Sequence, residues 1–141
     1  MPNIRWLLAL ITRVHRFLYR VSGGRIGGRL GGVSVLLLLN VGRKTGQRRE
    51  TPLLYIEDES RWVVVASNAG DDRNPAWWLN LNSNPDAEIL VKTERYKVRA
   101  RGASPEEKAR LWPRLDAAYR HYPDYRRRTH REIPVVILEP L

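Results

Sequence analysis

From residue 33 onward, short apolar runs recur between polar turns, a pattern typical of β-strands. A nearly continuous apolar run at the start of this region predicts a strand that is buried on both faces. Two alternating segments on either side of "KTE" predict a β-hairpin. "EDES" indicates a polar turn, and Pro134 suggests that the last strand starts at a sheet edge. The expected strands are Val33–Val41, Thr51–Ile56, Arg61–Ser67, Ala87–Lys92, Arg95–Arg101 and Ile133–Leu138.

Helical periodicity marks the N-terminal segment. Within Asn3–Val21 the apolar side chains fall on one side of a helix and the arginines lie elsewhere on it. Such a helix could lie on an anionic membrane surface, or it could pack against its own domain or a partner subunit, which is the commoner arrangement. Further along, "SPEE" at Ser104–Glu107 has the residues of a capping box and predicts a helix that runs to about Tyr119. Pro75 predicts a short helical turn.

These elements predict a mainly β fold with α additions: a small antiparallel barrel of about six strands, one helix before the last strand and an N-terminal helix. We expect residues 1–22 to form the N-terminal helix and residues 23–141 to form the barrel domain. Between them, "SGGRIGGRLGGV" holds six of the ten glycines and indicates a flexible connection. Parallel βαβ units and a G-x-G-x-x-G fingerprint are absent from the sequence, so a Rossmann-type nucleotide site is not expected.

Composition and charge narrow the choice of partners. The chain has 141 residues, of which 43% are hydrophobic and 28% charged, as in a globular domain, and its net charge of +10 calls for an anionic partner. Nucleic acid, anionic lipid and a polyanionic small molecule all fit that charge. The absence of cysteine and three scattered histidines make a metal site unlikely to form. No signal peptide and no membrane-length apolar run are evident, so we expect a cytoplasmic protein.

The stretch "LNVGRKTGQRRETPLLY" collects four cations, a threonine and two glycines between two predicted strands. "GRKT" resembles part of a P-loop, but the first glycine of that motif is missing and a strand follows where the motif needs a helix. The side chains and the backbone N–H groups freed by the glycines could cradle a phosphate or a carboxylate. A charged hairpin loop that only keeps the protein soluble would have the same composition, so the residues alone leave both interpretations open.

Two aromatic stretches help to decide whether the 42–49 stretch binds an anion or only keeps the protein soluble. "ASNAGDDRNPAWWLNLNSNP" follows a buried strand with a polar, glycine-bearing turn and then two adjacent tryptophans, which could form a flat wall for a ring system or simply pack in the core. In "AAYRHYPDYRRRTHREIP", three tyrosines recur at every third residue and share one side of a helix or turn. Taken alone, this spacing favours tyrosines that pack on the barrel with their hydroxyl groups in water.

The segments "GRKTGQRRETPL", "VVASNAGDDRNPAWWLNL" and the following "NP" resemble the family of deazaflavin-dependent nitroreductases and quinone reductases of actinobacteria. The resemblance covers roughly Gly24 to the C-terminus. Members of this family are small split β-barrel proteins that bind the 5-deazaflavin coenzyme F-420. The resemblance therefore implies an F-420-dependent reductase that passes hydride from the reduced coenzyme to a quinone, an activated enone or a nitroaromatic acceptor.

The resemblance also implies a site. The phosphate and polyglutamate-bearing tail of the coenzyme would be held by Arg43, Lys44, Thr45, Arg49, Glu50, Thr51, Pro52, Leu53 and Leu54. The deazaflavin ring would be bordered by Val65, Ala66, Ser67, Asn68, Ala76, Trp77, Trp78, Leu79, Asn80 and Tyr122. The substrate pocket would be formed by Tyr119, Tyr122, Tyr125 and Trp78. The catalytic candidates, which would hydrogen-bond the acceptor, are Ser67, Tyr122 and Tyr125, and one of them or water would relay the proton.

Other functions remain open at this point. A related barrel could bind FMN or haem, or could carry F-420 or a lipid without catalysis. A nucleic-acid-binding barrel would use the arginines on phosphates and the tryptophans for stacking, but no RNA-binding signature is present, so nucleic acid is the less expected partner. Residues 1–21 would suit an enzyme that contacts the inner face of the cell membrane, where it could meet a lipophilic quinone.

Overall fold

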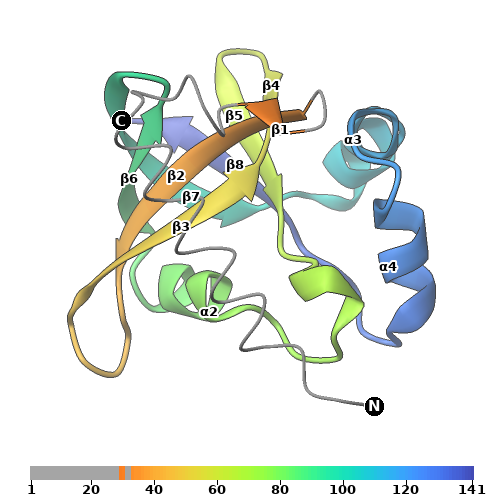
Figure 1. Cartoon of the computed structure of the whole chain (residues 1–141), viewed down its shortest axis with the longest axis horizontal. Coiled ribbons are helices and arrows are strands. Elements are labelled where there is room, and N and C mark those ends of the chain that lie inside the picture. Colours follow the sequence, from red (N-terminus) through yellow and green to blue (C-terminus); the bar gives the residue numbers. More distant parts are fainter. Residues whose placement is uncertain (1–28, 31–32) are drawn as a thin grey trace.

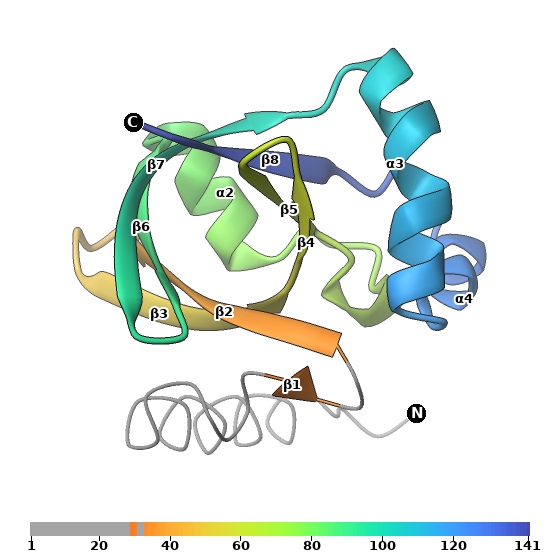
Figure 2. The same ribbon diagram turned by 90° about the horizontal axis from the view of Figure 1, so that it is seen from above.

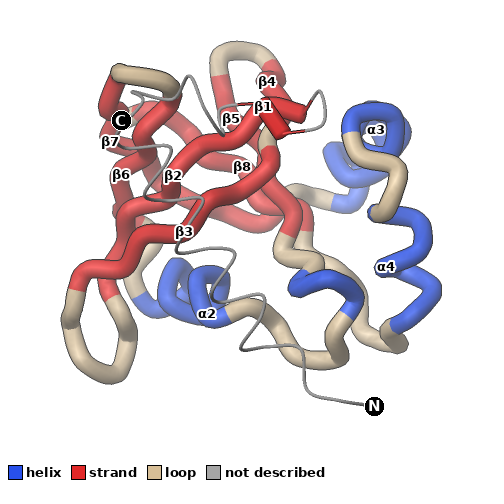
Figure 3. Tube along the Cα trace, in the orientation of Figure 1, coloured by secondary structure: helices blue, strands red, loops and turns tan. Residues whose placement is uncertain are grey.

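The computed structural model describes residues 29–30 and 33–141. In this part of the chain eight strands form one antiparallel sheet (Figures 1 and 3). The strands are β1 (Arg29–Leu30), β2 (Val33–Val41), β3 (Arg48–Leu54), β4 (Ile56–Asp58), β5 (Arg61–Val65), β6 (Asp86–Val91), β7 (Glu94–Gly102) and β8 (Val135–Pro140). The helical elements are η1 (Asn68–Gly70), α2 (Ala76–Ser83), α3 (Pro105–Ala118) and α4 (Tyr122–Arg128).

The sheet curls into a split barrel. Its strands follow the order β1-β2-β6-β7-β8-β5-β4, and β3 pairs with β2 outside this path. Figure 2 shows the strands surrounding α2, while Figure 1 places α2 below them, so this helix closes one end of the barrel. Helices α3 and α4 lie together on the outside, beside β5 and β8. The predicted mainly β, antiparallel split barrel with α additions is therefore present.

The barrel interior is the first hydrophobic core. Because successive side chains in a strand point to opposite faces, alternate residues such as Leu36 and Leu38 of β2 point inward. Both are fully buried, and Trp77 and Leu81 of α2 pack against the same cluster. The buried residues of this core are Leu36, Leu38, Trp62, Val64, Ala66, Trp77, Leu81, Ile89, Val98, Ala100, Val136 and Leu138. Helix α2 is thus held at the barrel end by its own apolar side chains.

A second hydrophobic core lies on the outer face of β5 and β8. There Leu111 and Leu115 of α3 and Tyr122 of α4 cover the strand residues, together with Ile133. The strand side of this core is Val63, Val65, Val135 and Ile137. Strands β5 and β8 are therefore buried on both faces, which explains why "RWVVV" and "VVIL" are nearly continuous apolar runs rather than alternating ones.

Helix α3 begins at the predicted capping box. The Ser104 hydroxyl accepts a hydrogen bond from the Glu107 backbone N–H at 3.2 Å, and the Glu107 carboxylate accepts one from the Ser104 N–H at 2.9 Å. The same carboxylate accepts two bonds from Arg101 of β7, at 2.7 and 2.9 Å. The hydrogen bonds from Arg101, and then those from Ser104, lower the pKa of Glu107 to about 2. Helix α3 is therefore capped and tied to the sheet by one side chain.

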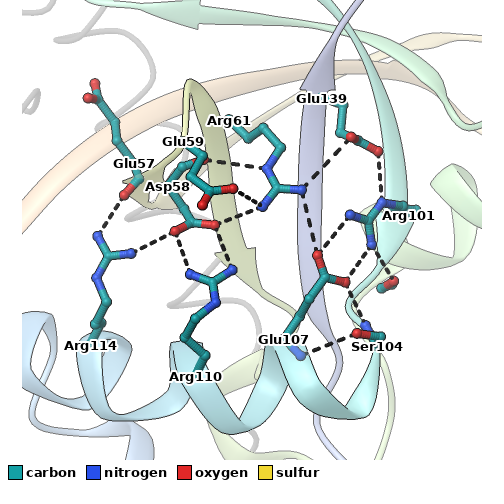
Figure 4. Close-up of polar contacts among 11 residues, drawn as sticks. Glu57, Asp58, Glu59, Arg61, Arg101, Ser104, Glu107, Arg110, Arg114 and Glu139 are labelled. Carbon is teal, nitrogen blue, oxygen red and sulfur yellow. Dashed lines mark hydrogen bonds and ion pairs between the residues drawn. The ribbon is translucent and has the colours of Figure 1, made fainter.

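A second ion-pair centre fastens α3 to β4 (Figure 4). Asp58, whose side chain is 4% exposed, accepts hydrogen bonds from Arg110 at 2.7 and 3.0 Å and from Arg114 at 2.9 Å. Arg61 of β5 donates to it as well, at 2.9 Å. The guanidinium groups of Arg110 and then Arg61 hold the pKa of Asp58 far below its usual range although burial acts in the opposite direction. Two arginines of α3, Arg110 and Arg114, therefore bind the helix to a buried carboxylate of the barrel, which Arg61 also holds from β5.

Most predicted elements are confirmed, and their boundaries differ from the predicted ones by at most three residues. Val33–Val41 forms a strand over its full predicted length, and α3 ends at Ala118, next to the predicted Tyr119. Two helices, α3 and α4, precede the last strand where one was expected. The reason is that His121 starts a new helical segment after the chain turns at Tyr119, whose φ and ψ are extended.

Three strand predictions need correction. The expected single strand at 51–56 is interrupted at Tyr55, and "EDES" supplies the last residues of β4 as well as a turn. The described sheet also contains β1, so it has eight strands rather than about six. Strand β8 lies between β7 and β5 rather than at an edge. Pro134 is tolerated because it precedes the first paired residue, and its carbonyl still accepts a hydrogen bond from the Ala66 N–H at 3.0 Å.

The predicted N-terminal helix lies outside the described residues, as does most of the glycine-rich connection. In the described part of the chain, no helix combines the length and the apolar character needed to cross a membrane.

Candidate cofactor site

The turn that joins β2 to β3, residues 42–47, is closed by its own backbone. The Gly42 N–H donates to the Gln47 carbonyl and the Gly46 N–H donates to the Gly42 carbonyl, both at 2.8 Å. At Gly42 the side chains of Thr45 and Arg49 approach the backbone so closely that an added Cβ would lie 3.1 Å from Thr45 Oγ1 and 3.3 Å from Arg49 Nε. Glycine at this position therefore lets a hydroxyl and a guanidinium group converge on the turn.

Helix α2 holds the turn from the other side. Asn80 is 6% exposed, and its Oδ1 accepts hydrogen bonds from both the backbone N–H and the guanidinium of Arg43, each at 3.0 Å. Asn40, at the end of β2, donates its Nδ2 to the Trp77 carbonyl at 3.2 Å. Its Oδ1 is a buried acceptor for which the described part of the chain provides no partner. The two asparagines thus fix the position of the turn relative to α2.

A cleft of about 410 Å³ opens between the turn and α2. Its walls are made by Gly42, Arg43, Lys44, Thr45, Arg49, Glu50, Thr51, Ala76, Trp77 and Asn80. The side chains of Arg43, Lys44 and Arg49 are exposed, and one carboxylate, Glu50, accompanies the three cations. Trp77 is 8% exposed because most of its ring packs in the barrel core. The cleft therefore combines a cationic rim with an apolar wall.

A neighbouring cleft of about 370 Å³ shares Arg49 and Glu50 with this one but has a different character. Arg95 on its wall is paired with Glu88 at 3.2 Å. Asp86, also on its wall, is paired with Arg99 at 2.9 Å. The lining of this cleft carries three carboxylate side chains, those of Glu50, Asp86 and Glu88, whereas the cleft beside α2 carries Glu50 alone, so the cleft beside α2 is the better anion site.

The connection from β5 to α2, residues 66–75, has an unusual backbone. Asn68, Ala69 and Gly70 have φ values of 47°, 53° and 80°, in the left-handed region. For a residue other than glycine this conformation costs about 1–2 kcal/mol. Helix α4 packs directly on this turn: a Cβ at Gly70 would lie 3.2 Å from Arg128 Cβ and 3.2 Å from Tyr125 Cα. The polar turn after β5 is therefore held against the tyrosine-bearing helix.

The three tyrosines form one aromatic cluster at the α3–α4 junction. The hydroxyls of Tyr119 and Tyr125 lie 3.1 Å apart, and the Tyr122 ring contacts Tyr119 edge-on with ring centres 4.9 Å apart. Tyr122 is 5% exposed and belongs to the second core. Burial, and then the hydrogen bond with Tyr125, raises the pKa of Tyr119 to about 12, and burial raises the pKa of Tyr122 as well. Tyr119 and Tyr122 are therefore neutral phenols near pH 7.

The predicted site residues fall into three groups. Those that line the cleft are Arg43, Lys44, Thr45, Arg49, Glu50, Thr51, Ala76, Trp77 and Asn80. Ser67 and Asn68 lie on the 66–75 connection. Tyr119 directly follows α3, and Tyr122 and Tyr125 lie on α4 beside the connection. The remaining residues lie along β3, at the end of β5 or on α2, outside the lining of the cleft: Pro52, Leu53, Leu54, Val65, Ala66, Trp78 and Leu79. Their contacts with a ligand stay predictions.

Two residues of this region were not expected from the sequence. Asn40 ends a continuous apolar run, and only the barrel shows that it points inward toward α2. Arg131 lies in an arginine-rich segment whose members the sequence does not distinguish, although in the structure it bonds to the 66–75 connection. A lone polar residue at the end of a buried strand was the one signal that could have identified Asn40.

The arginine-rich segment, residues 126–131, is one that a nucleic-acid-binding barrel could place on phosphates, and in the structure it makes internal contacts. Arg126 donates two hydrogen bonds to Asp116, both 2.8 Å, and lies 4.1 Å over the Trp112 ring. Arg127 pairs with Asp124. These contacts use the cations that a nucleic-acid surface would present to phosphates. Across residues 29–30 and 33–141, no three histidine, aspartate or glutamate side chains cluster in a way that could bind a metal ion.

Comparison with known proteins assigns the chain to a family. The family model described as F-420H(2)-dependent quinone reductase matches residues 11–140. A protein named F-420H(2)-dependent quinone reductase, from Mycobacterium tuberculosis (strain ATCC 25618 / H37Rv), is 42% identical over 132 residues, which cover 91% of this chain and 89% of that protein. A second protein of that strain, named for the same activity, is 46% identical over 108 residues, or 77% of this chain and 91% of that protein.

The fold agrees with these matches. A solved structure described as an F-420-H2 dependent reductase (FDR-A) superposes with a TM-score of 0.69 at 32% identity, covering 74% of this chain and 93% of that chain. The chain therefore belongs to the F-420H(2)-dependent quinone reductase family, a family of enzymes that depend on coenzyme F-420.

Proposed function

We propose that the cleft between the 42–47 turn and α2 holds the anionic tail of coenzyme F-420, and that the deazaflavin ring extends from there toward the 66–75 connection. The acceptor, a quinone in the first place and an activated enone or nitroaromatic as further candidates, would stack on the ring beside Trp78 and the tyrosines. The observation that carries the proposal is the cleft itself. Three cationic side chains, the Thr45 hydroxyl and the turn at Gly42 line it together with the side chain of Trp77.

The residues present fit such a coenzyme. A phosphate or carboxylate needs charge-assisted donors, and Arg43, Lys44 and Arg49 supply them on an exposed rim. Asn80 holds the Arg43 backbone and guanidinium through one oxygen, so that side chain is ordered before a ligand arrives. The close approach at Gly42 leaves no room for a side chain between the donors. The cleft volume of about 410 Å³ suits part of a large cofactor rather than a single ion.

The reaction divides between the coenzyme and the chain. When bound, reduced F-420 supplies a hydride from C5 of its ring. The chain binds the tail, and Trp77 offers a flat apolar surface that excludes water on one side. Ser67 and the tyrosines would hydrogen-bond the acceptor oxygen on which negative charge develops. These tasks are orientation and charge stabilisation, which need no covalent step on the protein.

The tyrosine pair is suited to donating a hydrogen bond rather than a proton. Tyr119 and Tyr125 together carry two hydroxyl hydrogens. One is used in the hydrogen bond between them, and the other remains available for a ligand. The raised pKa of Tyr119, about 12, makes full proton transfer unfavourable near pH 7. We therefore propose that water delivers the proton to the reduced acceptor while Tyr125 and Ser67 hold its oxygen.

The proposed cofactor site is tested by titrating F-420 into the purified protein and following cofactor fluorescence, with FMN as a parallel ligand. We expect micromolar binding of F-420 and little binding of FMN. The double variant Arg43→Ala/Lys44→Ala should lose about 100-fold or more in affinity, because two charge-assisted contacts are removed. The control Arg99→Ala/Arg127→Ala removes the same net charge from two exposed positions and should bind like the wild type.

Unchanged F-420 affinity in the Arg43→Ala/Lys44→Ala variant would place the tail elsewhere. Equal binding of FMN would instead favour the rival assignment to an FMN-binding barrel. If the wild type binds F-420 but reduces neither a quinone nor a nitroaromatic with the reduced coenzyme, the chain acts as a carrier.

A further inference from the structure

We propose that Arg131 is a positioning residue for the reduction: its guanidinium holds the 66–75 connection in the shape that presents Ser67 and the start of α2 to the cofactor ring. This inference rests on the proposed function, which places that connection beside the ring. Arg131 lies between α4 and β8, and it reaches the connection across more than fifty residues of sequence.

The contacts of Arg131 span most of the connection. Its Nε donates to the Asp71 carbonyl at 3.0 Å, and one terminal nitrogen donates to Asn74 Oδ1 at 2.9 Å. The other terminal nitrogen donates to the carbonyls of Ala66 and Ser67, at 3.2 and 2.8 Å. One planar group thus joins the exit of β5 to Asn74, two residues before the first residue of α2. A lysine carries its donors on one nitrogen and could not reach these separated acceptors together.

The partners of Arg131 indicate that geometry, rather than charge pairing, is its task. All four acceptors are carbonyl or amide oxygens, and none is a carboxylate. Burial lowers the pKa of the guanidinium, and Asp71 and Asp72 offset part of that effect through their charge. Desolvating a cation is costly unless its hydrogen bonds are satisfied, so this side chain is stable only when the connection adopts the observed shape.

The hydrogen bonds from Arg131 also determine the direction of the backbone N–H groups in this connection. In a planar trans peptide the carbonyl and the following N–H point in opposite directions. Because Arg131 binds the carbonyls of Ala66 and Ser67, the N–H groups of Ser67 and Asn68 point away from it. The left-handed backbone at Asn68 and Ala69 needs such external support. A second bond, from Thr129 Oγ1 to Asp72 Oδ1 at 2.8 Å, holds the middle of the same connection.

The test compares Arg131→Gln with Arg127→Gln, which removes an exposed arginine of the same segment. Two ligands are titrated by fluorescence: complete F-420, and the deazaflavin riboside-level analogue that lacks the phosphate and the glutamate tail. If Arg131 shapes the ring site, Arg131→Gln loses affinity for both ligands by the same factor, about 10- to 100-fold. Arg43→Ala/Lys44→Ala loses affinity for complete F-420 alone, and Arg127→Gln binds both like the wild type.

Two further readouts separate positioning from general stability. Hydrogen exchange in Arg131→Gln should speed up at residues 66–74 and remain at the wild-type rate in β2 and β6. With reduced F-420 and menadione, kcat should fall at saturating coenzyme in Arg131→Gln, and Arg131→Lys should recover only a small part of it because it restores charge without the planar donor set. Full recovery by Arg131→Lys would show that charge alone matters and would overturn the proposal.

The possible failures are distinguishable. If the wild type binds neither ligand, the proposed function fails and the role of Arg131 fails with it. If the wild type binds both and Arg131→Gln binds the tail-free analogue equally well, the role of Arg131 alone is overturned. Should Arg131→Gln not fold, Asn74→Ala removes a single acceptor and is expected to weaken binding of the tail-free analogue several-fold, and unchanged binding there would refute the proposal.

Discussion

Two glycines with similar backbone angles have different surroundings. Gly46 has a φ of +70° and lies in the cleft turn, where an added Cβ would meet nothing within 4 Å. Gly70 has a φ of +80° and lies under α4, where an added Cβ would be 3.2 Å from atoms of Tyr125 and Arg128. The first site needs glycine for conformation alone, whereas the second needs it for conformation and space.

Alanine substitution should separate these effects. Gly46→Ala should cost about 1–2 kcal/mol of unfolding free energy, the ordinary cost of a left-handed alanine. Gly70→Ala should cost roughly 3 kcal/mol or more, because α4 must also move away. The free energies of unfolding are measured by urea denaturation monitored by circular dichroism. Equal losses in the two variants would mean that α4 does not press on the 66–75 connection.

At the scale of elements, helix α3 is attached by charges as well as by apolar packing. Leu111 and Leu115 lie in the second core, while Arg110 and Arg114 on the same helix bond to Asp58 of β4. The buried carboxylate is the common partner, and the arginines are about half exposed. Removing the carboxylate therefore frees several side chains at once, whereas removing one arginine leaves the others in place.

We expect Asp58→Asn to lower the free energy of unfolding by roughly 2–3 kcal/mol, less than for a fully buried pair because water reaches the arginines. The loss should appear in urea denaturation, and hydrogen exchange should rise mainly in α3. Asp86→Asn is the matched control, since Asp86 and its partner Arg99 are both exposed, and it should change stability little. Similar effects of the two substitutions would rule out a special role for the Asp58 centre.

At the scale of the whole molecule, the shifted carboxylates set the acid limit of stability. Asp58 and Glu107 have pKa values held below their ordinary values of 3.8 and 4.5, that of Glu107 at about 2. Groups whose pKa is lowered by folding stabilise the protein above their unfolded pKa, and this contribution is lost as the pH falls toward the folded pKa. The buried tyrosines act in the opposite sense, because their raised pKa values favour the folded state below pH 10.

The contribution of these carboxylates and tyrosines to the free energy of unfolding should accordingly be nearly constant from about pH 5 to 9. It should fall at lower and at higher pH. The acid loss should begin near pH 4.5 and continue below pH 2, because the pKa of folded Asp58 is held lower than that of Glu107. In Asp58→Asn the slope of this loss should be smaller. The loss of stability at alkaline pH should begin near pH 10. Part of the tyrosinate absorbance should appear only when the protein unfolds, because the tyrosines with raised pKa values stay protonated in the folded state. Urea midpoints across this range provide the measurement, and an acid slope that is unchanged in Asp58→Asn would contradict the assignment to Asp58.

Much of the fold could be predicted from local pattern. The apolar run of β2, the "KTE" hairpin and the capping box of α3 depend on neighbouring residues, whose periodicity and capping chemistry act over a few positions. The division at Tyr55 and the interior place of β8 were not predictable in this way. They depend on which strands pair, and pairing is decided by contacts between residues far apart in the chain.

In the candidate site, too, some features follow from the local sequence and others only from the tertiary structure. The sequence by itself determined the donor-rich turn at 42–49, the paired tryptophans and the family, since these are properties of residue types in a fixed order. Only the tertiary structure decided that Asn80 orders Arg43 and that Trp77 serves both the core and the cleft. It alone showed that Arg131 holds the 66–75 connection, because a single guanidinium can bond at once to residues that only folding brings together.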